Sequence, residues 1–195
     1  MDRRQFISSS VAAASTGLIL PNQSQAFSFL GVNFGRATTS VSPKSEQRLH
    51  LHNIHTGETF DDVFKADGAH IPEALKALNY FMRDRRNNKQ IKMDPKLFDL
   101  LHTMQTLTGT KKPFEIVCGY RSPQTNEGLR RKNRGVAKNS QHLYGRAVDL
   151  YSPDVRLRDL RQAALSQEKG GVGFYPKSNF VHVDTRGHLA CWGAK

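Results

Sequence analysis

The order of apolar and polar residues predicts short strands and helices from about Gln47 onward. Strict alternation, or a short apolar run, is typical of strands, whereas apolar residues every three or four positions are typical of amphipathic helices. By these criteria the strands are 48–54, 59–64, 114–118, 146–151, 172–175 and 180–184. The helices are 72–82, 95–107, 123–131 and a segment from the cap Asp154 to about Gln167. Because strands and helices do not strictly alternate, the sequence predicts a single α+β domain with a small, mostly antiparallel sheet flanked by helices.

The first 26 residues have the pattern of an export signal. Arg3 and Arg4 form a basic start, small and apolar residues follow as far as Leu20, and residues 24–26 offer the small side chains that a signal peptidase needs. The paired arginines favour the twin-arginine route. The apolar run is too short and too rich in Ser and Ala for a stable membrane span. We therefore expect a periplasmic protein with a signal at 1–26, a flexible lead-in at 27–45 and one domain at 46–195, and leave open whether the signal is cleaved.

The chain is strongly basic, with 29 Lys and Arg against 17 Asp and Glu and a formal net charge of +12. Beyond the signal, 27 basic and 16 acidic residues remain, a net charge of +11. Such an excess favours polyanionic or carboxylate-rich partners. For an exported protein, a wall polymer with free carboxylates is a better match than nucleic acid, so no nucleic acid partner is predicted. The oligomeric state is not predicted by any feature of the sequence.

The two cysteines, Cys118 and Cys191, have neither the number nor the spacing of a disulfide framework or a zinc-binding pair. In an oxidising compartment they can pair if the fold brings them together. The apolar surroundings of Cys118 favour a buried free thiol equally, and both alternatives stay open.

Three segments carry side chains that suit a metal site. They are Gly-Tyr-Arg-Ser at 119–122, Ser-Gln-His-Leu-Tyr-Gly-Arg-Ala-Val-Asp at 140–149 and Phe-Val-His-Val-Asp at 180–184. In the second, His142 lies on a loop and Asp149 in the strand that follows, and Gly145 lets the backbone turn so that both side chains can converge. In the third, His182 and Asp184 face the same way because side chains alternate along a strand.

Two neutral imidazoles and one carboxylate, from His142, His182 and Asp149, are donors that Zn²⁺ accepts. Three protein ligands leave a fourth position for water. Because they carry a single negative charge, the zinc site stays net positive and lowers the pKa of that water to about 7, which permits hydrolysis of an amide without a nucleophilic Ser or Cys. A rival pair, His50 and His52, has no third partner indicated by the sequence, and we interpret it as structural.

The same segments resemble the LAS superfamily of zinc peptidases, which contains D-Ala-D-Ala carboxypeptidases, murein endopeptidases and the hedgehog-type zinc domain. The shared pattern is S-x-H-x-x-G-x-A-x-D, followed by a strand with a central His. Within this group the sequence most resembles the YcbK-like branch of murein endopeptidases. Further similar segments are 53–58, 119–126, 134–138, 170–176 and 178–185, and the resemblance extends from about residue 47 to residue 192.

The resemblance implies a hedgehog/D-Ala-D-Ala peptidase-like fold, with zinc ligands at His142, Asp149 and His182. It places Arg121 in the active site, where its guanidinium can clamp a substrate carboxylate or stabilise the oxyanion of the tetrahedral intermediate. It gives Ser140 a role in fixing the loop or in a hydrogen bond behind the ligands.

One position departs from the family pattern. Many relatives have a Glu or His two or three residues before the third ligand, where it acts as the general base. Here those positions are Asn179 and Phe180, which cannot accept a proton. Asp184 is the nearest acidic candidate for the base. It can instead orient a zinc ligand, and the sequence leaves both roles open.

The leading hypothesis is therefore a zinc-dependent murein endopeptidase that acts on peptidoglycan stem peptides, and the resemblance suggests the linkage between two meso-diaminopimelate residues. An alternative is a D-Ala-D-Ala carboxypeptidase that trims uncrosslinked stems. A third, from another class, is a zinc-stabilised wall-binding module without catalysis, which the missing base favours.

Overall fold

The computed structural model describes residues 45–133 and 135–194. The expected export signal at 1–26 lies outside the described residues, as does the expected lead-in except for Ser45. Within the described ranges no helix is long and apolar enough to cross a membrane.

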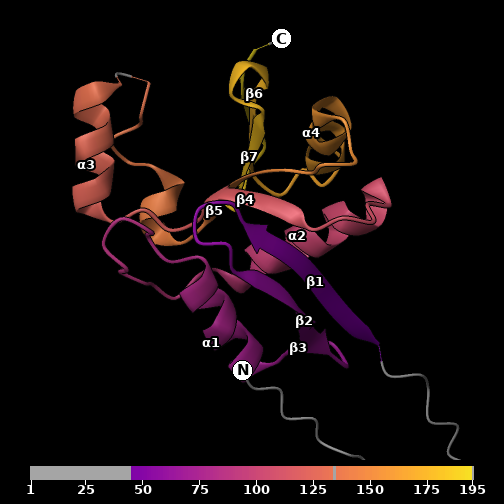
Figure 1. Ribbon diagram of the computed structural model, residues 1–195. Coiled ribbons are helices and arrows are strands. Elements are labelled where there is room, and N and C mark those ends of the chain that lie inside the picture. Colours follow the sequence, from indigo (N-terminus) through magenta and orange to yellow (C-terminus); the bar gives the residue numbers. More distant parts are fainter. Residues whose placement is uncertain (1–44, 134, 195) are drawn as a thin grey trace, which may run out of the picture. The chain divides into compact units, whose positions relative to one another are not determined.

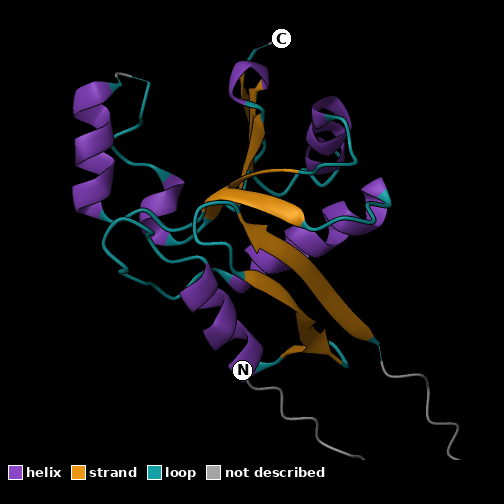
Figure 2. Cartoon of the chain, in the orientation of Figure 1, coloured by secondary structure: helices purple, strands orange, loops and turns teal. Residues whose placement is uncertain are grey.

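The described part of the chain forms eight strands and four α-helices (Figure 2). The strands are β1 (Glu46–Asn53), β2 (Thr59–Ala66), β3 (Ala69–His70), β4 (Phe114–Cys118), β5 (Ala147–Tyr151), β6 (Gly171–Tyr175), β7 (Phe180–Asp184) and β8 (Ala190–Gly193). The α-helices are α1 (Pro72–Phe81), α2 (Pro95–Thr108), α3 (Pro123–Lys132) and α4 (Leu157–Leu165). Two short 3₁₀ helices are η1 (Gln141–Tyr144) and η2 (Pro176–Ser178).

All eight strands belong to one sheet with the order β3-β2-β1-β4-β5-β7-β6-β8. Its neighbouring strands are antiparallel except for the pairs β1–β4 and β6–β8, which are parallel. The predicted α+β class with a mostly antiparallel sheet is therefore confirmed.

Three details of the predicted elements are wrong. The sequence pattern does not predict β3 and β8, because segments of two and four residues are too short to carry a clear alternation. The fourth helix begins after Arg156 and ends at Leu165, so it is shorter than the pattern indicated. Asp154 does not cap it, because its carboxylate instead accepts hydrogen bonds from the Thr110 hydroxyl at 2.7 Å and the Lys111 N–H at 2.8 Å.

The hydrophobic core lies where the helices cover the sheet. α2 packs against β1 and α4, α4 also packs against β6 and β7, and α1 packs against β2. Side chains in this core without accessible surface include Leu49, Leu51, Phe64, Leu97, Leu101 and Met104. Burying each of them stabilises the fold by roughly 1.5–3 kcal/mol. The apolar stripes of α1 and α2 thus have a purely structural role.

Helix α3 stands apart from α2 and α4 (Figure 1). Ser122 caps its N-terminus: the Ser122 Oγ accepts the Thr125 N–H at 3.3 Å, and the helix begins at Pro123. The segment that leads into α3 comes directly from β4 at the centre of the sheet. This connection places Arg121 beside the end of β4.

Candidate metal centre

One row of residues crosses five strands of the sheet. Cys118 of β4 pairs with Asp149 of β5, and Asp149 pairs with His182 of β7. His182 pairs with Gly173 of β6, which in turn pairs with Trp192 of β8. Residues directly opposite one another in a sheet share a face. The register therefore brings a thiol, a carboxylate, an imidazole and an indole to the same face.

The three ligands predicted from the sequence converge at this row. His142 enters from η1 rather than from an irregular loop, and its Nε2 lies 3.2 Å from Asp149 Oδ1 and 3.2 Å from His182 Nδ1. His182 Nδ1 lies 2.8 Å from the same Asp149 oxygen. Ligands about 2.0–2.2 Å from a tetrahedral zinc ion are about 3.3 Å from one another. The three donor atoms therefore have a spacing that fits a single zinc ion.

The other ring nitrogen of each histidine has its own acceptor. His142 Nδ1–H donates to the Gly119 carbonyl at 2.7 Å, which leaves Nε2 as the nitrogen that faces Asp149. Exposed fractions are only 2% for His142, 6% for Asp149 and 8% for His182. Such hydrogen bonds fix the orientation of the ring and select the nitrogen that can bind a metal.

Cys118 adds a second, overlapping donor set that the sequence did not indicate. One ligand atom each from Cys118, His142 and Asp149 lies within 4.8 Å of the others. Its place as the last residue of β4, directly before the Gly-Tyr-Arg-Ser segment, was the only available signal. Cys191 is exposed, and both cysteines are free, so they form no disulfide in the described structure.

The charges of this cluster are strongly coupled. Burial by itself lowers the pKa of His142, but the nearby Asp149 and Cys118 outweigh it and raise that pKa to about 10. For Asp149, burial raises the pKa, whereas the positive charge and hydrogen bonds of the two histidines lower it well below its usual range. Burial raises the pKa of the Cys118 thiol, but His142 and the positive charge of Arg121 together lower it, with a net decrease. Asp149 is thus ionised and His142 protonated near neutral pH, an ion pair whose proton a metal ion would replace.

Asp184 lies behind His182 and has no accessible surface. His182 Nε2 donates to its Oδ2 at 3.1 Å, the Gly171 N–H donates to Oδ1 at 2.8 Å, and Arg186 binds both oxygens, the shortest contact being 2.6 Å. Burial raises the pKa of Asp184, but these donors lower it well below its usual range. Both carboxylate oxygens already accept hydrogen bonds, so the contacts suit an orienting role better than proton transfer.

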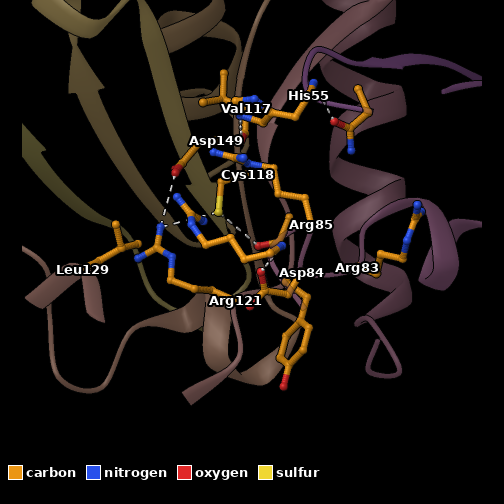
Figure 3. Close-up of a pocket in the computed structure, with 13 residues that line it drawn as sticks. His55, Arg83, Asp84, Arg85, Val117, Cys118, Arg121, Leu129 and Asp149 are labelled. Carbon is orange, nitrogen blue, oxygen red and sulfur yellow. Dashed lines mark hydrogen bonds and ion pairs between the residues drawn. The ribbon is translucent and has the colours of Figure 1, made fainter. Parts of the chain in front are cut away.

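Arg121 extends toward Asp149 and Cys118 (Figure 3). Its guanidinium lies 3.8 Å from Asp149 Oδ2 and 3.5 Å from Cys118 Sγ, and it donates to Asn126 Oδ1 at 3.4 Å. Its Nε is buried and has no hydrogen-bond partner. An unpartnered buried donor is costly, so this guanidinium has capacity for an oxygen of a bound substrate.

Ser140 precedes η1 at its cap position, and its carbonyl accepts the Leu143 N–H at 3.0 Å. Its side chain makes no capping hydrogen bond. The rival histidines lie in β1, where His52 pairs with Glu115 of β4, an acidic partner that the sequence did not reveal.

A cleft of about 770 Å³ opens onto the cluster, with His142, Asp149 and His182 in its lining. Aromatic rings form one wall: Tyr175 stacks on Phe180 with ring centroids 4.6 Å apart, and Trp192 Nε1 donates to the Tyr175 hydroxyl at 2.8 Å. Trp192 also lies 5.2 Å from the His182 ring. Phe180, one of the two positions where the family resemblance leads us to expect a general base, thus forms part of the wall of the cleft.

A family model, Peptidase_M15_2, described as Peptidoglycan L,D-endopeptidase MepK, matches residues 41–192. Peptidoglycan L,D-endopeptidase MepK of Escherichia coli (strain K12) is 47% identical over 149 residues, which cover 76% of this chain and 82% of the relative. Probable peptidoglycan L,D-endopeptidase MepK of Haemophilus influenzae is 44% identical over 153 residues, covering 78% and 82%.

Among solved structures, the L-Ala D-Glu endopeptidase ChiX of Serratia marcescens aligns with a TM-score of 0.32 and 20% identity, over 48% of this chain and 70% of that chain. The family match and the two relatives confirm the resemblance found in the motifs. The chain belongs to the Peptidase_M15_2 family, the family of peptidoglycan L,D-endopeptidase MepK.

Proposed function

We propose that this protein is a zinc-dependent murein endopeptidase that hydrolyses peptide cross-links of peptidoglycan, specifically those between two meso-diaminopimelate residues. The observation that carries the proposal is the cluster of His142, Asp149 and His182 within a large cleft, in a chain whose relatives are named peptidoglycan L,D-endopeptidases. The linkage between two meso-diaminopimelate residues joins an L centre to a D centre, which agrees with the bond type in that name.

The donor set fits zinc. Two imidazole nitrogens, Nε2 of His142 and Nδ1 of His182, and one carboxylate oxygen of Asp149 would hold the ion, and their mutual spacing is that of a tetrahedral site. When bound, zinc supplies a Lewis acid that lowers the pKa of water to about 7 and polarises the amide carbonyl.

Two further side chains have supporting roles: Arg121 binds the substrate, and Asp184 orients a zinc ligand. Arg121 presents a buried guanidinium with an unpartnered Nε beside the cluster, where it can hold a carboxylate of the substrate or an oxygen that gains negative charge during hydrolysis. Of the two roles that the sequence leaves open for Asp184, we assign it the orientation of His182, because its oxygens are already occupied by donors. The aromatic wall beside His182 excludes water from one side of the cleft.

The partner and the compartment follow from the same proposal. Peptidoglycan stem peptides carry free carboxylates, and a chain with a net charge of +12 attracts them. Such a substrate lies outside the cytoplasm, which agrees with the proposed twin-arginine signal at 1–26 and a periplasmic location.

The test is digestion of isolated peptidoglycan by the purified protein, with and without zinc, with the products resolved by mass spectrometry. Loss of cross-linked dimers that needs both zinc and His142, shown with a His142→Ala control, supports the endopeptidase, and the linkages that survive identify the bond. Intact dimers at full zinc loading contradict it.

A second candidate is a wall-binding module without catalysis. The observation that favours it is the absence of a proton acceptor at Asn179 and Phe180, where the latter forms part of the cleft wall. Sedimentation of the protein with insoluble murein, without soluble fragments, would favour this function. If pentapeptide monomers lose one alanine while dimers persist, the protein is instead a D-Ala-D-Ala carboxypeptidase.

A further inference from the structure

A second cavity, of about 300 Å³, adjoins the metal centre (Figure 3). It shares Arg121 and Asp149 with the large cleft but is otherwise lined by different residues, among them Arg85 and Arg86. A peptide whose scissile bond lies at the cluster can therefore extend one group into this cavity while the rest occupies the cleft.

The cavity is lined by four arginines and two aspartates, and most of these charges already have partners. Arg83 pairs with Glu58 at 2.8 and 3.1 Å and stacks over Tyr80, and Figure 3 draws it away from Asp149 and Arg121. Asp149 belongs to the metal cluster. The Asp84 carboxylate accepts hydrogen bonds from the N–H and hydroxyl of Ser122 and from the N–H of Arg86.

Arg85 and Arg86 are the exceptions. Among the residues that the structure describes, neither guanidinium lies within ion-pair distance of a carboxylate. His55, also in the lining, does not offset them: burial and the positive charges of Arg85 and Arg86 lower its pKa, and its ring donates to the Val117 carbonyl at 3.0 Å. The cavity therefore has an uncompensated positive charge.

The arginines are held in place relative to the metal centre. The Tyr120 N–H donates to the Met82 carbonyl at 2.7 Å, and Asp84 binds Ser122 through two hydrogen bonds of 2.9 and 2.7 Å. These contacts flank Arg121 on both sides along the chain. The segment that carries Arg85 and Arg86 is thus fixed to the segment that carries Arg121, which favours a preorganised site.

We propose that Arg85 and Arg86, together with Arg121, form a subsite for a free carboxylate that the substrate carries next to the scissile bond. This inference rests on the proposed function. In the linkage between two meso-diaminopimelate residues, the carbon that bears the acylated amine also bears a free carboxylate. Guanidinium groups bind a carboxylate through paired, charge-assisted hydrogen bonds, and an amidated carboxyl has no charge to match them. The subsite therefore selects cross-links in which this carboxyl group is free.

The test compares two purified muropeptide dimers that differ only in whether this carboxyl group is free or amidated. For the zinc-loaded full chain, we expect kcat/KM to be 10- to 100-fold, in order of magnitude, higher on the free acid. The double variant Arg85→Ala, Arg86→Ala loses about this factor on the free acid, mainly through KM, and almost nothing on the amide. The conservative variant Arg85→Lys, Arg86→Lys keeps the charge without the paired geometry and gives an intermediate KM.

A matched control is Arg158→Ala with Arg161→Ala, which removes the same charge from α4 and leaves the preference for the free acid unchanged. Equal rates of the wild-type protein on the two dimers overturn the proposal. A loss in the double alanine variant that is the same on both dimers also overturns it, because that result indicates a structural role or general attraction of anions.

Failure of the proposed function is recognised separately, as the absence of cleavage of either dimer by the wild-type protein. The subsite is then tested by calorimetric titration of the full chain with the two intact dimers. Weaker binding of the free acid after removal of Arg85 and Arg86, with binding of the amide unchanged, supports it. Equal affinities of the wild-type protein for the two dimers overturn it.

Discussion

His182 Nε2 donates to Asp184 Oδ2 over 3.1 Å, so the opposite ring nitrogen, Nδ1, is the one that faces Asp149 and His142. Asp184 is itself held by the Gly171 N–H and by Arg186, and it has no accessible surface. A carboxylate behind a metal-binding histidine fixes the ring and raises its basicity. In the proposed zinc site, this contact would let Asp184 influence the metal without coordinating it.

Replacement of Asp184 by Asn is expected to weaken zinc affinity by about 10- to 100-fold, because His182 loses its charged partner. The affinity is measured by competition with a chelator, and circular dichroism checks that the variant folds. Asp62→Asn, at an exposed position of β2, is the control and should have unchanged affinity. Unchanged zinc affinity together with a lost kcat would instead identify Asp184 as the proton acceptor.

The two overlapping donor sets share His142 and Asp149, and they make opposite predictions for substitution of His182 and of Cys118. If His142, Asp149 and His182 hold the ion, His142→Ala and His182→Ala lose stoichiometric zinc, whereas Cys118→Ala and the control Cys191→Ala retain it. The cobalt-substituted protein should then lack a thiolate-to-cobalt charge-transfer band. Loss of zinc in Cys118→Ala, with zinc retained in His182→Ala, would establish the set Cys118, His142 and Asp149.

Zinc binding should release protons near neutral pH. Although burial lowers the pKa of His142, the adjacent Asp149 and Cys118 raise it to about 10, so the metal-free protein holds a proton that a ligand must give up. Between the ordinary histidine pKa of about 6.5 and a pH of about 10, each binding event releases about one proton from this residue, and the apparent affinity rises about tenfold per pH unit. Calorimetry at pH 7.5 in buffers of different ionisation enthalpy measures the release. Binding without proton release would show that His142 is neutral before the metal arrives.

Gly170 lies where β6 passes the backbone of β7. A Cβ atom there would lie 1.7 Å from the Asp184 carbonyl oxygen, which belongs to the backbone and cannot rotate away. Gly170→Ala should therefore lower the free energy of unfolding by about 3 kcal/mol or more, measured by urea denaturation. Gly128 of α3 is the contrast, since a Cβ atom there meets nothing within 4 Å. Gly128→Ala should raise stability by roughly 0.5–1 kcal/mol, and equal effects of the two substitutions would contradict this account.

Arg121 presents a buried, incompletely bonded guanidinium to the cluster. Arg121→Lys keeps the charge but loses the fork of donors, and kcat/KM on cross-linked dimers should decrease by about 10²- to 10³-fold with zinc content unchanged. Arg130→Lys, in the last turn of α3, should leave kcat/KM unaltered. A loss of zinc in Arg121→Lys would mean that this residue acts by holding Asp149.

Local patterns were sufficient for most of the fold. Alternation and helical spacing predicted six of the strands and the four helices, because each pattern is set by which neighbours along the chain are apolar. The motifs also indicated His142, Asp149 and His182, which the structure brings within 3.2 Å of one another. The errors, β3, β8 and the start of α4, occur where a segment is too short for a pattern or where a polar side chain has a distant partner, as Asp154 has in Thr110.

The long-range relationships required the folded chain. Strand register places Cys118 opposite Asp149 and Trp192 opposite Gly173, and register depends on pairing between segments far apart in sequence. The occupied oxygens of Asp184 depend on β6 lying beside β7. The arginine cavity likewise depends on long-range contacts: the Met82 carbonyl accepts a hydrogen bond from the Tyr120 N–H, 38 residues further along the chain, and Asp84 binds Ser122. Composition alone shows an excess of basic residues. Among the described residues, tertiary contacts pair some of these with carboxylates and leave Arg85 and Arg86, which line the cavity beside Asp149, without an ion-pair partner.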